Sequence, residues 1–106
     1  MDTFEESTHL LVKAILSLKT EEECRAFLED LMTGKEIQDC SQRLFVAKLL
    51  REKHIYNDIV ASTGASTATI SRVNRCYTYG SGGYKLVLER ISPASPAAAD
   101  SAAKEP

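Results

Sequence analysis

One stretch of the chain, residues 55–76 (IYNDIVASTGASTATISRVNRC), constrains the fold more than any other. Apolar residues recur at helical spacing on both sides of its glycine. They are Ile59, Val60, Ala65, Ile70 and Val73. Gly64 can adopt the positive φ angle of a sharp helix exit, and the hydroxyls of Ser66 and Thr67 can cap a new helix. The stretch therefore predicts two short helices joined by a tight turn, which is a helix-turn-helix arrangement.

The outward side of the second predicted helix carries small, hydroxyl-bearing or cationic side chains and no carboxylate. Its members are Ser66, Thr67, Ala68, Thr69, Ser71, Arg72 and Arg75. Small residues allow close approach to a DNA major groove, hydroxyls reach phosphates or base edges, and arginine reads guanine or neutralises phosphate. We therefore take these residues as candidate DNA-binding residues. This stretch alone leaves open the alternative of a solvated face on an ordinary helical hairpin.

The charge of the 106-residue chain is unevenly distributed, although its net value is only −2. Residues 1–41 hold 4 Lys and Arg against 10 Asp and Glu, a net charge of −6. Residues 42–90 hold 8 against 3, which is +5, and residues 91–106 hold 1 against 2, which is −1. The positive segment contains the helix-turn-helix, so the pattern points to an anionic partner for that segment. An acidic half folding against a basic half would give the same pattern.

Several classes of protein find no support in the sequence. No apolar run approaches the roughly 18–20 residues of a membrane span, and no signal peptide follows the acidic start, so we expect a cytoplasmic protein without a membrane partner. Cys24, Cys40 and Cys76 are too widely spaced for a disulfide framework or a zinc motif. No catalytic triad, paired carboxylate or cofactor loop is evident. We therefore expect no enzymatic activity, no metal and no cofactor.

Helical periodicity covers most of the rest of the chain. In addition to the two helices of the helix-turn-helix, the predicted helices are residues 4–18, 21–32, 35–53 and 84–91. Thr20 and Glu23 have capping-box spacing at the start of the second, and we expect Gly34 to end it. The glycine-containing residues 77–84 are predicted to be a flexible loop. The fold class is therefore predicted to be all-α, with about six helices.

The centre of the third predicted helix, residues 44–50, is apolar almost all round. Such a helix must be covered on more than one side, and a second subunit is the easiest source of cover in so short a chain. We therefore expect a homodimer, with the apolar core completed by Leu86, Val87 and Ile91. Its two-fold symmetry would place two recognition helices about one turn of DNA apart.

The sequence divides into a helical domain and a tail. The helical domain is predicted to be residues 1–91. Residues 92–106 are rich in Ala, Pro and Ser and nearly free of large apolar groups. Such a segment cannot bury enough apolar surface to offset the entropy of ordering, so we expect a disordered tail.

The sequence resembles the Trp repressor superfamily, and most of all its YerC/YecD group of Trp-repressor-related proteins. The resemblance spans about residues 7–91. Its motifs are AILSLKTEEEC (14–24), EIQDCSQRL (36–44) and TGASTATISRV (63–73). The resemblance implies an intertwined all-α dimer whose fourth and fifth helices form the DNA-reading head, as in the Trp repressor itself. It also implies that Thr67, Ala68 and Ser71 read bases partly through water.

The resemblance implies a tryptophan site as well, and here the chain departs from the family pattern. The repressor holds tryptophan with two arginines. Arg72 matches the one on the reading helix, whereas Gln42 stands at the other position, and we expect Arg43 to lie on a different face. Val73 and Cys76 replace a glycine and a serine. Because an amide cannot supply a guanidinium fork and valine fills the space, tryptophan is not expected as a corepressor.

These features together predict a sequence-specific, DNA-binding transcriptional regulator, a repressor, that acts as a homodimer on double-stranded DNA. The alternative is a protein-interaction module that keeps the helix-turn-helix scaffold but no longer reads an operator. Its acidic N-terminal half would then be the contact surface. Binding to a protein that survives nuclease and high salt would favour this alternative.

Overall fold

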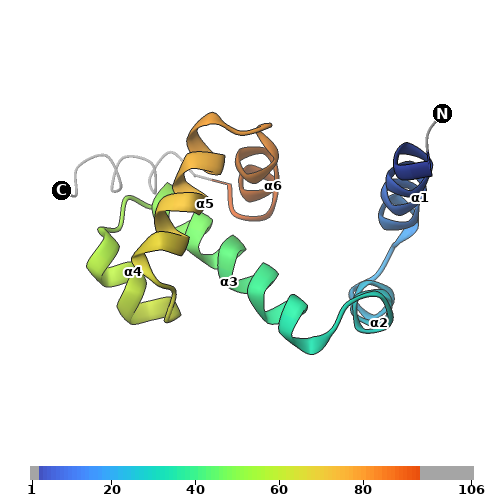
Figure 1. Ribbon diagram of the computed structural model, residues 1–106, viewed down its shortest axis with the longest axis horizontal. Helices are drawn as coiled ribbons and strands as arrows, with labels where there is room; N and C mark the ends of the chain where they lie inside the picture. Colours follow the sequence, from blue (N-terminus) through green and yellow to red (C-terminus); the bar gives the residue numbers. More distant parts are fainter. Residues whose placement is uncertain (1–2, 94–106) are drawn as a thin grey trace. The chain divides into compact units, whose positions relative to one another are not determined.

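The computed structural model describes residues 3–93, which form six helices and no strand (Figure 1). The helices are α1 (Thr3–Ser17), α2 (Glu21–Leu31), α3 (Gly34–Arg51), α4 (Tyr56–Thr63), α5 (Thr67–Tyr79) and α6 (Gly83–Ile91). They confirm the predicted all-α fold. Of the predicted tail, residues 94–106 lie outside the described part, so its disorder stays a prediction. The helices fall into two units, one ending at Ile37 and the other beginning at Gln38.

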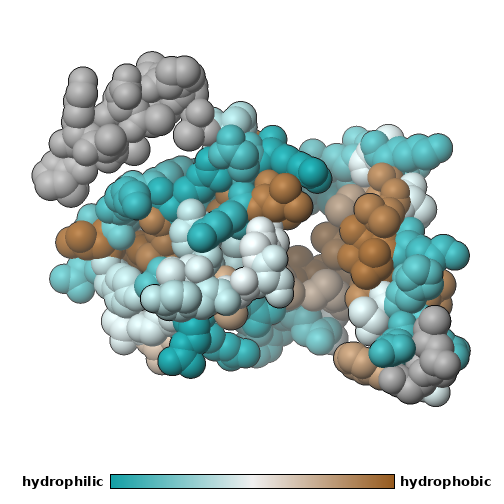
Figure 2. Space-filling view, turned by 90° about the horizontal axis from the view of Figure 1, so that it is seen from above, coloured by the Kyte–Doolittle hydropathy of each residue, from teal (hydrophilic) through white to brown (hydrophobic). Residues whose placement is uncertain are grey.

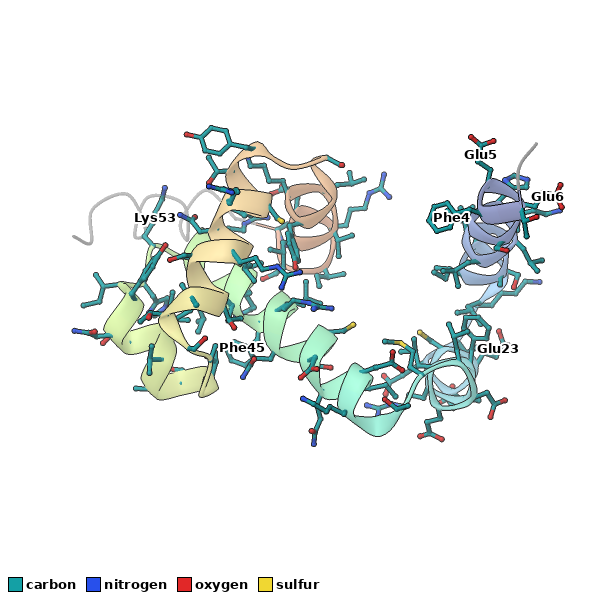
Figure 3. The ribbon with its side chains drawn as sticks, in the orientation of Figure 1. Phe4, Glu5, Glu6, Glu23, Phe45 and Lys53 are labelled. Atoms are coloured by element: carbon teal, nitrogen blue, oxygen red, sulfur yellow. The ribbon has the colours of Figure 1, made fainter. Side chains whose placement is uncertain are left out.

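The first unit contains α1 and α2 and has no buried core. No side chain of either helix is buried. The exposed large apolar residues here are Phe4, Leu10, Leu11, Val12, Ile15, Leu16 and Leu31. In Figure 2 hydrophobic residues, coloured brown, lie open on the surface of this unit, and in Figure 3 Phe4 projects from α1. These helices therefore lack the apolar burial from which most helical stability comes.

A capping box begins α2, as predicted from the sequence. Thr20 Oγ1 accepts a hydrogen bond from the backbone N–H of Glu23 at 3.1 Å. In return, the Glu23 carboxylate accepts from the backbone N–H of Lys19 at 2.9 Å. The Thr20 bond pairs an N–H group that the first turn of a helix otherwise leaves unpaired. The Glu23 carboxylate pairs the N–H of Lys19, the residue before the cap, rather than that of Thr20 itself.

A second capping box begins α3, and it corrects the prediction for Gly34. The Thr33 hydroxyl accepts from the backbone N–H of Glu36 at 3.1 Å, and the Glu36 carboxylate accepts from that of Thr33 at 2.9 Å. Gly34 is consequently the first residue of α3. The prediction that it ends the preceding helix is wrong, because α2 ends at Leu31 and Met32 is already extended.

The end of α3 is a left-handed turn centred on Lys53, the residue at which the sequence predicts the helix to end. Lys53 has a φ of +68°. Its backbone N–H donates to Leu50 O, and the N–H of His54 donates to Leu49 O, each at 3.1 Å. These two bonds form a Schellman motif, which closes a helix by pairing its last carbonyls. The helix therefore stops at Arg51.

The second unit has a continuous apolar core. Its buried side chains are Val46, Ala47, Leu49, Ile59, Ala65, Ile70, Val73 and Leu88. They come from α3 to α6 and from the turn between α4 and α5, and α5 packs against both α4 and α6 (Figure 1). An ion pair between Arg51 and Glu89 also joins α3 to α6. The helix-turn-helix therefore lies on a packed base.

Helix α5 is longer than the sequence predicted. Residues 77–79 were expected in a flexible loop, yet they continue the helix, and Tyr77 packs against the core. The helix ends where the N–H of Gly80 donates to Cys76 O at 2.9 Å. A Cβ atom at position 80 would lie 2.3 Å from that same oxygen. The close approach therefore requires glycine here, and only residues 80–82 separate α5 from α6.

Candidate nucleic-acid interface

Gly64 forms the turn between α4 and α5. It has a φ of +73°, and its N–H donates to Val60 O at 2.9 Å. The Thr63 hydroxyl donates to Ile59 O at 2.7 Å and accepts from the N–H of Ala65 at 3.1 Å. These bonds close the turn from within and confirm the prediction of a tight turn at Gly64.

Ser66 caps the start of α5. Its hydroxyl oxygen accepts from the backbone N–H of Thr69 at 3.1 Å and lies 3.1 Å from the Thr69 hydroxyl, to which it donates. The first turn contains no acidic residue. Because the N-terminal end of a helix carries partial positive charge, the start of α5 suits an anion such as phosphate.

Most of the predicted site residues lie on the outward side of α5. The exposed ones are Ser66, Thr67, Ala68, Ser71, Arg72 and Arg75. Ile70 and Val73 on the opposite side are buried in the core. Thr69 is the exception, because it is half-buried and faces a pocket. The structure therefore brings the predicted residues together on one side of the helix, apart from Thr69.

A polar pocket of about 210 Å³ lies between α3 and α5. Its lining residues are Asp39, Gln42, Arg43, Thr69, Arg72 and Val73. The prediction that Arg43 lies on a different face from Gln42 is wrong. Positions 39, 42 and 43 are three and four apart, so they share a helix face, and this spacing is the signal that sequence reasoning missed. Arg43 Nη2 also donates to Cys40 Sγ at 3.2 Å.

The residues at the tryptophan positions do not fit tryptophan. Val73 is only 2% exposed and fills the place beside Arg72. Gln42 Nε2 donates to the carbonyl oxygen of Thr63 at 3.2 Å, so this amide is already engaged with the α4–α5 turn.

Residues 3–93 offer neither a metal-binding cluster nor a helix that could span a membrane. Within that range no cluster of three or more His, Cys, Asp or Glu side chains could hold a metal ion. None of the helices described there combines the length and hydropathy of a membrane span. Cys24, Cys40 and Cys76 are free thiols.

Comparison with known proteins decides the family. The family model described as Trp repressor protein matches residues 6–92. The chain belongs to the Trp repressor family. This confirms the resemblance seen in the sequence. Because the Trp repressor family consists of non-enzymatic regulators, it also confirms that the chain is not an enzyme.

Several known proteins are similar to this chain in sequence or structure. Uncharacterized protein YerC of Bacillus subtilis is 54% identical over 81 residues, covering 76% of this chain and 78% of the relative. The crystal structure of a TrpR-like protein from Eubacterium eligens gives a TM-score of 0.78 at 53% identity, covering 81% of this chain and 89% of that chain. The crystal structure of a proposed Trp repressor from Staphylococcus aureus gives a TM-score of 0.77 at 42% identity, covering 86% of this chain and 95% of that chain.

Proposed function

We propose that this chain is a sequence-specific, DNA-binding transcriptional regulator, a repressor, that acts as a homodimer and reads DNA with α5. One observation carries the proposal, which is the chemistry of the outward side of α5. This side combines exposed hydroxyl-bearing, small and cationic side chains, and no carboxylate occurs between Gly64 and Tyr79. A duplex groove lined by phosphates favours that combination.

The residues of this side divide by the contact each can make. Ser66, at the open start of α5, is proposed to bind phosphate. Arg72 and Arg75 are proposed to contact phosphate or guanine. The short side chains Thr67, Ala68 and Ser71 are proposed to face base edges, partly through water. Thr69 is part of the predicted set, but its bond to Ser66 gives it a supporting place at the helix start.

The charge of the surrounding segment supports the same partner. Residues 42–90, which include the C-terminal part of α3, all of α4 and α5, and α6 except Ile91, carry a net charge of +5. Binding of such a segment to DNA releases counterions, so affinity falls steeply as salt increases. A salt-dependent affinity is therefore a direct consequence of the proposal.

The homodimer is proposed from apolar surface that the single chain leaves open. Helices α1 and α2 bury no side chain. In the second unit, Phe45 on α3 is 49% exposed and Ile91 on α6 is 65% exposed, and a hollow of about 500 Å³ between α3, α5 and α6 is lined by residues that include Leu44 and Val87. Monomeric proteins rarely leave this much apolar surface in contact with water. A second copy of the chain would cover it and align two α5 helices.

Selection of DNA by the full chain from a random duplex pool tests the proposed function. We expect enrichment of a sequence with two-fold symmetry, bound with a negative slope of log affinity against log salt. The double variant Arg72→Ala, Arg75→Ala should enrich nothing. Failure of the wild-type chain to enrich any sequence, together with an affinity independent of salt, would contradict the proposal. Capture of a protein that resists nuclease and high salt would then favour an interaction module.

A further inference from the structure

A side-chain amide from α3 reaches the turn of the helix-turn-helix. Gln42 Nε2 donates to the carbonyl oxygen of Thr63 at 3.2 Å, across 21 positions of the sequence. Thr63 is the last residue of α4, and the last carbonyls of a helix have no partner within that helix. Both residues are half-buried, so the carbonyl is partly withdrawn from water. The amide therefore supplies a partner that the turn does not supply itself.

The other interactions at the α4–α5 turn define the orientation of the turn on α3 less strictly than the Gln42–Thr63 hydrogen bond does. The bonds of the Thr63 hydroxyl and of Gly64 lie within α4 and the turn, so they fix local shape only. The buried side chains of Ile59, Ala65 and Ile70 attach the two helices and the turn to the core, but apolar contact is non-directional. A hydrogen bond depends on angle as well as distance. Because Ser66 caps α5 three residues beyond Thr63, a rotation of the turn changes the direction of α5.

We propose that Gln42 is a positioning residue for DNA reading. Its amide fixes the α4–α5 turn on α3 and thereby sets the orientation of α5, and this tie needs no bound small molecule. The inference rests on the proposed function, since Gln42 acts on DNA only through α5. It gives a physical role to the residue that stands where the family pattern has a tryptophan-binding arginine.

The substitution Gln42→Met tests the role in DNA binding, because methionine is similar in length but has no N–H to donate. Gln38→Met is the matched control, since Gln38 is an exposed glutamine on the same helix. Each protein is refolded from denaturant to remove small molecules. Affinity is then measured for the sequence selected by the wild-type chain and for a random duplex. The readout is the ratio of the affinity for the selected sequence to the affinity for the random duplex. A change in net charge affects both affinities and therefore changes this ratio little.

We expect Gln42→Met to lower this ratio by about 2- to 12-fold, the effect of losing one hydrogen bond. Gln38→Met should leave the ratio unchanged. Gln42→Lys, which restores a donor, should restore most of it. An unchanged ratio in Gln42→Met would overturn the proposal. So would an effect of the substitution that appears only after L-tryptophan or a mixture of the standard amino acids is added.

Hydrogen exchange tests the tie without DNA. In Gln42→Met the backbone amides of Gly64 and Ala65 should exchange faster, whereas that of the buried Leu88 should not change. A second comparison uses the wild-type chain alone and so does not depend on whether a variant folds. In this chain the side-chain amide protons of Gln42 should exchange more slowly than those of Gln38. Equal exchange at Gln42 and Gln38 would overturn the proposal. A wild-type chain that prefers no DNA sequence would contradict the proposed function instead, and the exchange rates would still decide whether Gln42 holds the turn.

Discussion

At the scale of single residues, neighbours on α5 have separable roles. Arg75 is exposed and makes no hydrogen bond or ion pair that would hold its guanidinium to the rest of the described chain. A guanidinium in this position is available to a phosphate, and each neutralised phosphate adds about 0.9 to the salt slope on duplex DNA. Arg75 is therefore the residue whose removal reports most simply on DNA contact.

We expect Arg75→Ala to weaken binding to all DNA sequences alike and to reduce the slope of log affinity against log salt by about 0.9 per chain. Titration of a labelled duplex at several salt concentrations measures both effects. Arg25→Ala serves as the control, because Arg25 on α2 is exposed but already paired with Glu21 at 2.8 Å. A slope that is the same in Arg75→Ala and the wild type would show that Arg75 contacts no phosphate.

Ser66 and Ser71 should differ in what they contribute to stability. The Ser66 hydroxyl caps α5, so Ser66→Ala should lower the free energy of unfolding by about 1 kcal/mol. Ser71 is exposed and lies one helical turn inside the N-terminal end, so Ser71→Ala should change stability by less than about 0.5 kcal/mol while weakening binding to the selected sequence. Denaturant unfolding and duplex titration of both variants measure the two effects. Equal loss of stability in both variants would contradict this division.

The outward side of α5 could be predicted because it follows from the spacing of Ile70 and Val73, which are three apart and face the core. The cap at Ser66 could also be predicted from the sequence, because hydroxyl residues satisfy the first N–H groups of a helix. The contact between Gln42 and Thr63 could not be predicted from the sequence. It joins positions 21 apart, and no local pattern specifies which of the glutamines on α3 meets the turn.

At the scale of elements, Gly64 and Gly34 differ in backbone conformation, although neither site is sterically crowded. Gly64 has a φ of +73°, where a side chain is strained, although a Cβ atom there would meet nothing within 4 Å. Gly34 lies in the first turn of α3, without a positive φ and equally free of contacts. The same substitution at the two sites therefore isolates the cost of the left-handed conformation from any steric effect.

We expect Gly64→Ala to lower the free energy of unfolding by about 1–2 kcal/mol, the cost of a left-handed residue that bears a Cβ atom. Gly34→Ala should raise it by about 0.5–1 kcal/mol, because alanine loses less backbone entropy on entering a helix. Denaturant unfolding under matched conditions measures both. Gly64→Ala as stable as the wild type would mean that the turn does not need glycine.

The positions of the helices were largely predictable, and most predicted ends lie within two residues of the observed ones. The exceptions are the role of Gly34 and the end of α5. The prediction that Gly34 is a helix stop is wrong because Thr33 and Glu36 form a capping box around it. Residues 77–79 were assigned to a loop because of the glycines that follow, whereas packing of Tyr77 on the core extends α5. Local turn chemistry and tertiary packing compete at helix ends, and composition alone does not say which prevails.

At the scale of the whole molecule, the first unit depends on what covers it. Leu16 on α1 is 78% exposed in the single chain. In a stable monomer, a charge at such a site would change stability by less than about 0.5 kcal/mol. Leu16 is one of the exposed apolar residues of α1 that the proposed homodimer would cover. A carboxylate at this position would then be withdrawn from water without a partner.

We therefore expect Leu16→Glu to lower the free energy of unfolding by more than about 2 kcal/mol and to shift sedimentation from dimer to monomer. Thr8→Glu adds the same charge at a polar, exposed position of the same helix and should change neither property. The unfolding midpoint of the wild type should also rise with protein concentration. A wild-type chain that sediments as a monomer would contradict the proposed homodimer.

Footprinting by hydroxyl radicals tests most directly whether paired α5 helices read DNA. The duplex is the sequence that the wild-type chain selects from a random pool. We predict two protected segments related by two-fold symmetry, with centres about 10–10.5 base pairs apart, because that spacing places both helices on one side of the duplex. No protection, or a single protected segment without a symmetric partner, would contradict the proposal.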